Sequence, residues 1–248
     1  MSSQVFEGKV VVVTGASKGL GRAMALGFAD AGADLVLASR HVESCEKVAD
    51  EVRSRGRRAL AAACHVGDWG QCDALIDLVV ETFGHIDVLV NNAGIAPVPP
   101  SLREVTSELF DKTIAVNLKG PLRLSARAAE FMPPGSSIIN ISSKAALHPS
   151  PSTVVYAAAK AGLNALTRAM AREFGPDIRV NAIVCGTFHT ASFDSSVPNP
   201  EAAATMASGL ALSRIAQPEE IVGTALYLGS NASSYLTGEL IVLDGGGI

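Results

Sequence analysis

The stretch VVVVTGASKGLGRAMALGF, residues 10–28, decides the fold of this chain. Four successive valines form an apolar run of strand length, and Gly15, Gly19 and Gly21 lead from it into an Ala-rich helical segment. Glycines at a strand-to-helix turn let the backbone approach a pyrophosphate closely, and a helix N-terminus favours the anion. The spacing is GxxxGxG, which differs from the GxGxxG fingerprint. We interpret the turn as a nucleotide cradle; a tight turn without a ligand is the alternative.

The pattern of this first unit recurs along the whole chain. Apolar runs typical of strands covered on both faces lie at 9–14, 34–38, 60–64, 86–91, 137–142, 179–184 and 239–243. Helices are expected between them at 20–31, 42–55, 69–83, 107–131, 154–174 and 218–228. No linker divides the chain. The alternation predicts an α/β fold, a single-domain doubly wound (Rossmann) seven-stranded parallel sheet over residues 1–248 with helices on both faces.

Composition excludes several classes of protein. Of the 248 residues, 48% are hydrophobic and 18% are charged, which excludes a disordered chain. The net charge is -4 and no run of like charges supplies a basic face, so we expect no nucleic-acid partner. No apolar stretch is long enough for a membrane span, and no secretory signal is expected. The four cysteines form no CxxC pair, so we expect reduced thiols, a cytoplasmic location and no metal site.

The corner after the second predicted strand reads Ala38-Ser39-Arg40. A carboxylate at this corner would accept a hydrogen bond from a ribose 2′-hydroxyl, whereas a guanidinium accommodates a 2′-phosphate. Asp34 begins the strand and is too early to reach a ribose, and Lys18 in the glycine turn can add a second cation. The corner therefore favours NADP(H) over NAD(H); two solvated surface cations are the alternative.

Tyr156 and Lys160 are four residues apart in a helical stretch, so their side chains lie on one face of the helix. The pKa of a free phenol is about 10, and the neighbouring ammonium is expected to lower the pKa of Tyr156. The pair would then act as a base in alcohol oxidation or as an acid in carbonyl reduction. Ser143 ends a predicted strand, at the edge where parallel strands converge on a ligand crevice. Ser142 is the adjacent alternative, and a serine at a strand end is often only a turn former.

With these residues assembled, the chain resembles the short-chain dehydrogenase/reductase family over about residues 10–246. Besides the glycine turn and the set Ser143, Tyr156 and Lys160, the matching segments are NNAG at 91–94, VNL at 116–118, TG at 237–238 and DGG at 244–246. The resemblance implies that Tyr156 exchanges the proton, that Ser143 holds the substrate oxygen, and that Lys160 also holds the nicotinamide ribose. Asn117 would support a water-linked proton relay, and hydride would pass between nicotinamide C4 and the carbonyl carbon.

The resemblance also implies a set of cofactor-binding residues. These are Gly15, Ser17, Lys18, Gly19, Leu20, Gly21, Ser39, Arg40, His65, Val66, Asn92, Ala93, Gly94, Tyr156, Lys160, Gly186, Phe188 and Thr190. Two positions depart from the family pattern. His65 stands where the family has Asp, and it either contacts adenine or caps the strand end. Cys185 stands where the family has Pro, and it is either a thiol near the nicotinamide or an inert buried cysteine.

The segment 188–212 corresponds to the mobile lid that such proteins place over their substrate. It contains no Lys or Arg, and Asp194 and Glu201 are its only acidic residues. A site for a phosphorylated or carboxylated substrate usually recruits cations. We therefore expect a small neutral carbonyl or alcohol substrate, with His148 as a further residue that could line its pocket.

The leading hypothesis is an NADP(H)-dependent oxidoreductase that interconverts a carbonyl and a secondary alcohol. A 3-oxoacyl thioester (acyl carrier protein) reductase is the alternative within the family. Its acyl carrier would dock on arginines that occur as i, i+4 pairs, unless these are ordinary solvated faces: Arg123, Arg127, Arg168 and Arg172. A non-catalytic cofactor-sensing protein is the third hypothesis, against which the complete set Ser143, Tyr156 and Lys160 weighs. The resemblance also implies a homotetramer.

Overall fold

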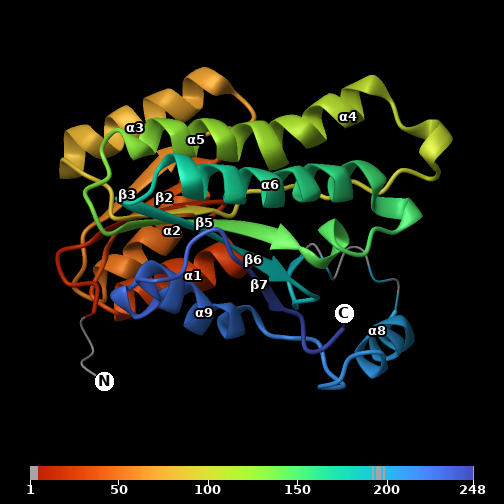
Figure 1. Ribbon diagram of the computed structural model, residues 1–248. Coiled ribbons are helices and arrows are strands. Elements are labelled where there is room, and N and C mark those ends of the chain that lie inside the picture. Colours follow the sequence, from red (N-terminus) through yellow and green to blue (C-terminus); the bar gives the residue numbers. More distant parts are fainter. Residues whose placement is uncertain (1–4, 192, 194–196, 198, 248) are drawn as a thin grey trace.

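The computed structural model describes residues 5–191, 193, 197 and 199–247 of the chain, and its centre is one parallel sheet (Figure 1). Seven strands pair in the order β3-β2-β1-β4-β5-β6-β7, and each pairing is parallel. The strands are β1 Val10–Thr14, β2 Asp34–Ser39, β3 Ala59–Ala63, β4 Val88–Asn91, β5 Ser136–Ser143, β6 Ile178–Cys185 and β7 Leu240–Leu243. The predicted doubly wound parallel sheet is confirmed, with strand ends that differ by at most two residues from those expected.

Helices cover both faces of the sheet (Figure 1). They are α1 Gly19–Asp30, α2 Val42–Arg53, α3 Trp69–Phe83, α4 Ser107–Ile114, α5 Gly120–Ala129, α6 Val154–Glu173, α8 Pro200–Ser208 and α9 Val222–Gly229. Successive side chains of a strand point to opposite faces, so β1 feeds two cores. Val11 and Val13 pack in the core with α1, α2 and α9, whereas Val10 and Val12 pack in the core with α3 and α5. An apolar run without alternation is therefore what this sheet requires.

The crevice for a ligand lies where the strand order reverses, between the carboxyl ends of β1 and β4. Thr14 ties these two ends together. Its hydroxyl donates to the carbonyl oxygen of Val90 at 3.2 Å and accepts from the backbone N–H groups of Asn92 and Ala93 at 3.0 and 3.1 Å. The floor of the crevice is thus set by hydrogen bonds that leave the two strand ends little freedom.

The prediction of one continuous helix over 107–131 is wrong, because the helix is interrupted. A π-helical turn, Ala115–Lys119, separates α4 from α5. Pro121 lies in the first turn of α5 and has no N–H to donate to the carbonyl group of Asn117, so a regular α-helix cannot continue through this point. The side chain of Asn117 also donates to the carbonyl oxygen of Thr113 at 2.9 Å.

Two further segments differ from expectation. The helix expected at 218–228 begins as a 3-10 helix, Pro218–Ile221, before α9 starts. Helix α8 was not predicted, although the sequence carries its start signal: Asn199 accepts a hydrogen bond from the N–H of Ala202, and Pro200 is the first helical residue. The expected lid, 188–212, includes α8, while 192, 194–196 and 198, with Asp194 among them, lie outside the described residues.

Among the described helices, none has the length and the apolar character that crossing a bilayer requires. Within the same ranges, His, Cys, Asp and Glu side chains form no group of three that could hold a metal ion. Cys45, Cys64, Cys72 and Cys185 are all buried free thiols.

Candidate active site

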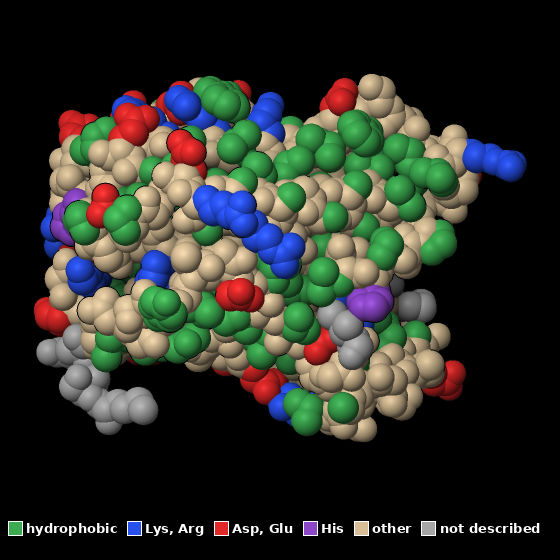
Figure 2. All heavy atoms as spheres, in the orientation of Figure 1, with side chains coloured by type: hydrophobic (Ala, Val, Ile, Leu, Met, Phe, Trp, Pro, Cys, Tyr) green, Lys and Arg blue, Asp and Glu red, His purple; other side chains and the backbone are tan. Residues whose placement is uncertain are grey.

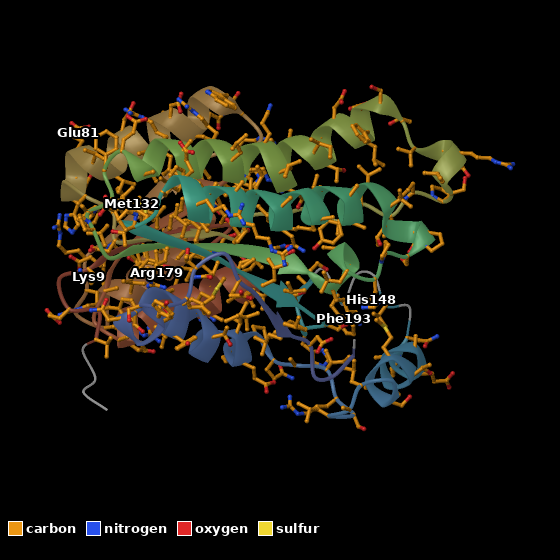
Figure 3. All side chains as sticks on the ribbon, in the orientation of Figure 1. Lys9, Glu81, Met132, His148, Arg179 and Phe193 are labelled. Atoms are coloured by element: carbon orange, nitrogen blue, oxygen red, sulfur yellow. The ribbon has the colours of Figure 1, made fainter. Side chains whose placement is uncertain are left out.

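A cleft of about 1190 Å³ lies at the carboxyl ends of the strands. All residues expected to hold the cofactor line it, from the glycine turn to Phe188 and Thr190, and so does Ser143. Figure 2 shows that the face with α4 and α8 is hollowed between them, and Figure 3 shows His148 and Phe193 at this hollow, above α8. The cleft thus has a nucleotide end at the glycine turn and a substrate end beside α4 and α8.

The glycine turn is built for close approach of a ligand to the backbone. Gly15 and Gly19 have positive φ angles of 66° and 55°. A Cβ atom at Gly21 would lie 2.2 Å from the carbonyl oxygen of Gly15 and 2.6 Å from Nδ2 of Asn92, so only glycine fits there. The first turn of α1 opens into the cleft, and the first N–H groups of a helix have no partner within the helix. These residues therefore fit a pyrophosphate.

The cations at the nucleotide end are not neutralised by the protein. Lys18 and Arg40 line the cleft, and neither forms an ion pair within the described ranges. In contrast, Arg22 on α1 pairs with Glu51 on α2. Glu108, which α4 contributes at the substrate end, is the one carboxylate among the described lining residues. An anionic group at the nucleotide end would meet positive charge without a competing carboxylate.

His65 lies in the loop that follows β3 and lines the nucleotide end of the cleft. Its Nδ1 accepts a hydrogen bond from the N–H of Gly67 at 3.2 Å, and its own N–H donates to Oε1 of Gln71 at 2.8 Å. Because Nδ1 accepts, the ring proton of the neutral imidazole is on Nε2. The two expectations for His65 are therefore compatible, since it stabilises the end of the strand and also lines the cleft.

Ser143, Tyr156 and Lys160 come together in the middle of the cleft. Burial raises the pKa of Tyr156 to about 12, and a hydrogen bond with Ser143 opposes this rise. Burial lowers the pKa of Lys160 to about 8. The Nζ atom of Lys160 donates to the carbonyl oxygen of Ile141 at 2.7 Å and lies 5.8 Å from the centre of the Tyr156 ring.

The expected lowering of the Tyr156 pKa by Lys160 is thus not present in this structure. Burial has the largest influence on that pKa, and the Nζ atom of Lys160 binds the carbonyl oxygen of Ile141 instead. The choice between the two serines is clearer. Ser143 acts on the pKa of Tyr156 and lowers it, whereas the buried hydroxyl of Ser142 has no partner among the described residues. Ser143 is therefore the serine beside the phenol.

Asn117 does not line the cleft with the other expected catalytic residues. Its side chain is buried and holds the loop after β4: Nδ2 donates to the carbonyl oxygen of Ile95 at 2.8 Å, and Oδ1 accepts from the N–H of Ile95 at 3.2 Å. It lies close to Lys160 all the same, because a Cβ atom at Gly94 would be 2.9 Å from Oδ1 of Asn117 and 3.6 Å from Nζ of Lys160. Its side chain supports the site from behind.

Cys185 lines the cleft as an inert thiol. Burial raises its pKa to about 12, and the charge of Lys160 only partly opposes this. A thiol with such a pKa stays protonated near neutral pH. Only glycine fits at the next position, Gly186, because a Cβ atom there would lie 2.5 Å from Cα of Asp244. Thr190 reaches the glycine turn, where a Cβ atom at Gly19 would lie 3.4 Å from its Cγ2.

The substrate end contains residues that the sequence analysis did not name. They line the cleft from α4 and its start and from the segments around β5 and α6: Thr106, Leu109, Lys112, Thr113, Lys144, Ser150 and Thr153. The signal that could have found them is their position, since both segments follow the carboxyl ends of strands. Exposed hydrophobic side chains occur on α4 and α8 and in the segments before α4 and after β5: Val98, Leu102, Phe110, Leu147 and Met206. Figure 2 shows hydrophobic surface over α4.

The four arginines considered as an acyl-carrier surface separate into two pairs. Arg123 and Arg127 on α5 form ion pairs with Asp73 and Asp77 on α3. Arg168 and Arg172 are exposed on α6, and neither forms an ion pair in the part of the chain that the structure describes. Figure 2 shows basic side chains along α6 in the middle of this face. Two of the four arginines are therefore engaged by α3, and the other two remain available on α6 within the described ranges.

Known proteins share this architecture. A short-chain dehydrogenase from Burkholderia cenocepacia, solved in complex with NADP, superimposes with a TM-score of 0.93 at 30% identity, over 98% of this chain and 99% of that chain. A family model described as enoyl-(acyl carrier protein) reductase matches residues 15–247. The chain belongs to the short-chain dehydrogenase/reductase family.

Curated members of the short-chain dehydrogenase/reductase family match along nearly their full length. An uncharacterized oxidoreductase from Thermotoga maritima is 38% identical over 97% of this chain and 98% of the relative. A 3-oxoacyl-[acyl-carrier-protein] reductase from the same organism is 36% identical over 97% and 98%. This chain is accordingly an oxidoreductase of the short-chain dehydrogenase/reductase family, and its cleft fits the nicotinamide cofactor of that family.

Proposed function

We propose that the protein is an NADP(H)-dependent oxidoreductase that interconverts a neutral carbonyl compound and the corresponding secondary alcohol. One observation carries the proposal. The pair Ser143 and Tyr156, with Lys160 beside it, lines a cleft whose nucleotide end holds Lys18 and Arg40, two cations without an ion pair among the described residues. The structural relative solved with NADP supports the choice of cofactor.

The site residues divide the work of carbonyl reduction. The hydroxyl groups of Ser143 and Tyr156 would donate hydrogen bonds to the substrate oxygen, and Tyr156, whose raised pKa keeps it protonated, would then transfer its proton to that oxygen. Lys160 would stabilise the resulting tyrosinate after its ammonium, 5.8 Å from the centre of the Tyr156 ring, leaves the carbonyl oxygen of Ile141. A bound nicotinamide would supply the hydride. In alcohol oxidation the same groups would act in reverse.

The cofactor choice follows from charge. A 2′-phosphate carries negative charge that a guanidinium can bind with two parallel hydrogen bonds. Arg40 is exposed and unpaired within the described ranges, and Ser39 beside it uses its hydroxyl on the carbonyl oxygen of His41 at 2.9 Å. No carboxylate among the described lining residues of this end is available for a ribose 2′-hydroxyl. NADP(H) is thus favoured over NAD(H).

The substrate end favours a carbonyl compound with apolar substituents. Hydrophobic residues such as Leu109, Phe193 and Met206 line it, and α8 lies over it as part of the lid proposed at 188–212. Lys112 and Lys144 also line this end, so its cations come from outside the proposed lid. A 3-oxoacyl thioester is the second candidate, favoured by the similar 3-oxoacyl-[acyl-carrier-protein] reductase and by the exposed pair Arg168 and Arg172 on α6. We include in the proposal a homotetramer, which light scattering after gel filtration would test.

A turnover assay tests the proposed function. We expect NADPH-dependent reduction within a panel of neutral ketones and 3-oxoacyl thioesters. Replacing Tyr156 with Phe should lower kcat by about a thousandfold, because the proton donor is lost while the ring remains. NADPH affinity, measured by fluorescence, should stay within about twofold of the original value. Turnover that survives in Tyr156→Phe would refute the mechanism.

A further inference from the structure

Two buried cysteines lie near each other beside the nucleotide end of the cleft. Cys64 follows β3, and Cys72 lies in the first turn of α3. The Sγ atom of Cys64 is 3.5 Å from the carbonyl oxygen of Gln71, and the Sγ atom of Cys72 is 3.2 Å from that of Val66. Each thiol therefore contacts the backbone within two residues of the other cysteine.

The two thiols are also chemically unequal. The influence of each thiol on the other lowers the pKa of Cys64 and raises that of Cys72. Cys45 and Cys185 have no such partner: the Sγ of Cys45 lies 3.2 Å from the hydroxyl of Ser39, and that of Cys185 lies 3.8 Å from the carbonyl oxygen of Ile183. Since the thiolate is the reactive form, Cys64 is the nucleophile of the pair.

Cys64 can be reached from the cleft. It lines the cleft together with His65 and Val66, with 2% of its surface exposed. Cys72, in contrast, is fully buried behind it. A small oxidant that enters the cleft without a bound nucleotide therefore meets Cys64 first, and Cys72 is next to it.

We propose that Cys64 and Cys72 form a reversible disulfide, and that closing it weakens nucleotide binding by displacing residues 65–68, the loop between β3 and α3. With hydrogen peroxide as the oxidant, the Cys64 thiolate attacks one peroxide oxygen and becomes a sulfenic acid as hydroxide leaves and takes up a proton. The Cys72 sulfur then attacks the Cys64 sulfur, and the sulfenic oxygen leaves as water with the Cys72 proton. Two thiols and one peroxide thus give one disulfide and two waters.

The packing of the loop decides where the displacement goes. A disulfide requires the two sulfur atoms to approach to about 2.05 Å, which is closer than thiols in contact. Behind the loop, the π-helical turn and α5 leave no room, because a Cβ atom at Gly120 would lie only 2.4 Å from the carbonyl oxygen of Val66. The N–H of Cys64 is held by the carbonyl oxygen of Ser39 at 2.8 Å. His65 and Val66 would therefore move on the cleft side, where the nucleotide binds.

The test uses the whole purified protein in reduced form, treated with hydrogen peroxide. Peptide mapping without reductant should find a Cys64–Cys72 crosslink, and fluorescence titration should show about tenfold weaker binding of the nicotinamide nucleotide that the reduced protein prefers. Dithiothreitol should restore the affinity, and nucleotide added beforehand should slow the crosslink. Neither readout depends on turnover or on which nucleotide binds, so the result stands apart from the proposed function.

Matched variants complete the test. Cys72→Ala should bind nucleotide in the reduced state and keep its affinity in peroxide, whereas Cys45→Ala should form the crosslink as the original protein does. Cys72→Ser serves the same purpose if the alanine variant does not fold. The proposal is overturned if the nucleotide-free protein forms no crosslink, if the crosslink leaves the affinity unchanged, or if Cys72→Ala loses affinity in peroxide to the same extent.

Discussion

The two ends of the cleft differ in how their residues are held. At the nucleotide end, the glycine turn packs so closely on Asn92 that a Cβ atom at Gly21 has no space, and Thr14 joins the two strand ends by hydrogen bonds. At the substrate end, α8 lies over the opening without a single buried residue. The comparison teaches that this protein presents a fixed cradle for a nucleotide and a more adaptable wall for a substrate.

The largest effect is expected from filling the fixed cradle. Gly21→Ala places a methyl group 2.2 Å from the carbonyl oxygen of Gly15, so the turn must open. We expect nucleotide affinity, measured by fluorescence titration, to fall by about a hundredfold or more. Gly223→Ala on α9 is the matched control, because a Cβ atom there meets nothing within 4 Å. Equal nucleotide affinity in both variants would show that the turn is not a fixed cradle.

The next effect concerns the buried Lys160 and has a defined pH dependence. Burial lowers its pKa from 10.5 to about 8. Between these values the unfolded chain holds the proton that the folded chain has lost, so this residue makes stability rise with pH. From about pH 8 to pH 10, the original protein should gain about 2 kcal/mol of unfolding free energy relative to Lys160→Met.

Denaturant unfolding at several pH values measures this difference. The comparison with Lys160→Met removes the contributions of Cys45, Cys64 and Cys72, on whose pKa values Lys160 has no influence. Parallel stability curves for the two proteins over this pH range would contradict the burial of a titrating lysine at the centre of the cleft.

The smallest effect is expected at the adaptable wall. Asn199→Ala removes the side chain that caps α8, which should cost that helix about 1 kcal/mol. KM for the carbonyl substrate should rise by a few-fold while nucleotide affinity stays constant. Asp68→Ala removes the corresponding cap of α3, next to the loop after β3, and should instead change nucleotide affinity. The reverse pattern would show that the two ends are not independent.

Sequence reasoning succeeded where a local pattern and the final structure agree. The uninterrupted valines of β1, the glycine turn and the four-residue spacing of Tyr156 and Lys160 each carry their own structural meaning, and the sheet with its crevice follows from them. The π-helical turn at Ala115–Lys119 was missed, although Pro121 marks it, because the apolar spacing continues through it. The spacing of hydrophobic residues does not reveal that one backbone hydrogen bond, from position 121, is missing.

Long-range contacts account for the other differences. The sequence does not show that Nζ of Lys160 binds the carbonyl oxygen of Ile141, that the side chain of Asn117 is used up on Ile95, or that Arg123 pairs with Asp73. In each case the partner lies on another element and is brought near only by the complete fold. Residue type and spacing predicted which groups gather in the cleft, but not which partner each one takes.

The most direct test of the account is a fluorescence titration of the purified protein with NADPH and with NADH at equal ionic strength. The unpaired charges of Lys18 and Arg40 at the nucleotide end predict that NADPH binds about tenfold more tightly, a difference of about 1.4 kcal/mol. Arg40→Ala should lose most of this preference while its affinity for NADH is retained. Equal binding of the two nucleotides, or tighter binding of NADH, would contradict the assignment of this cleft to NADP(H).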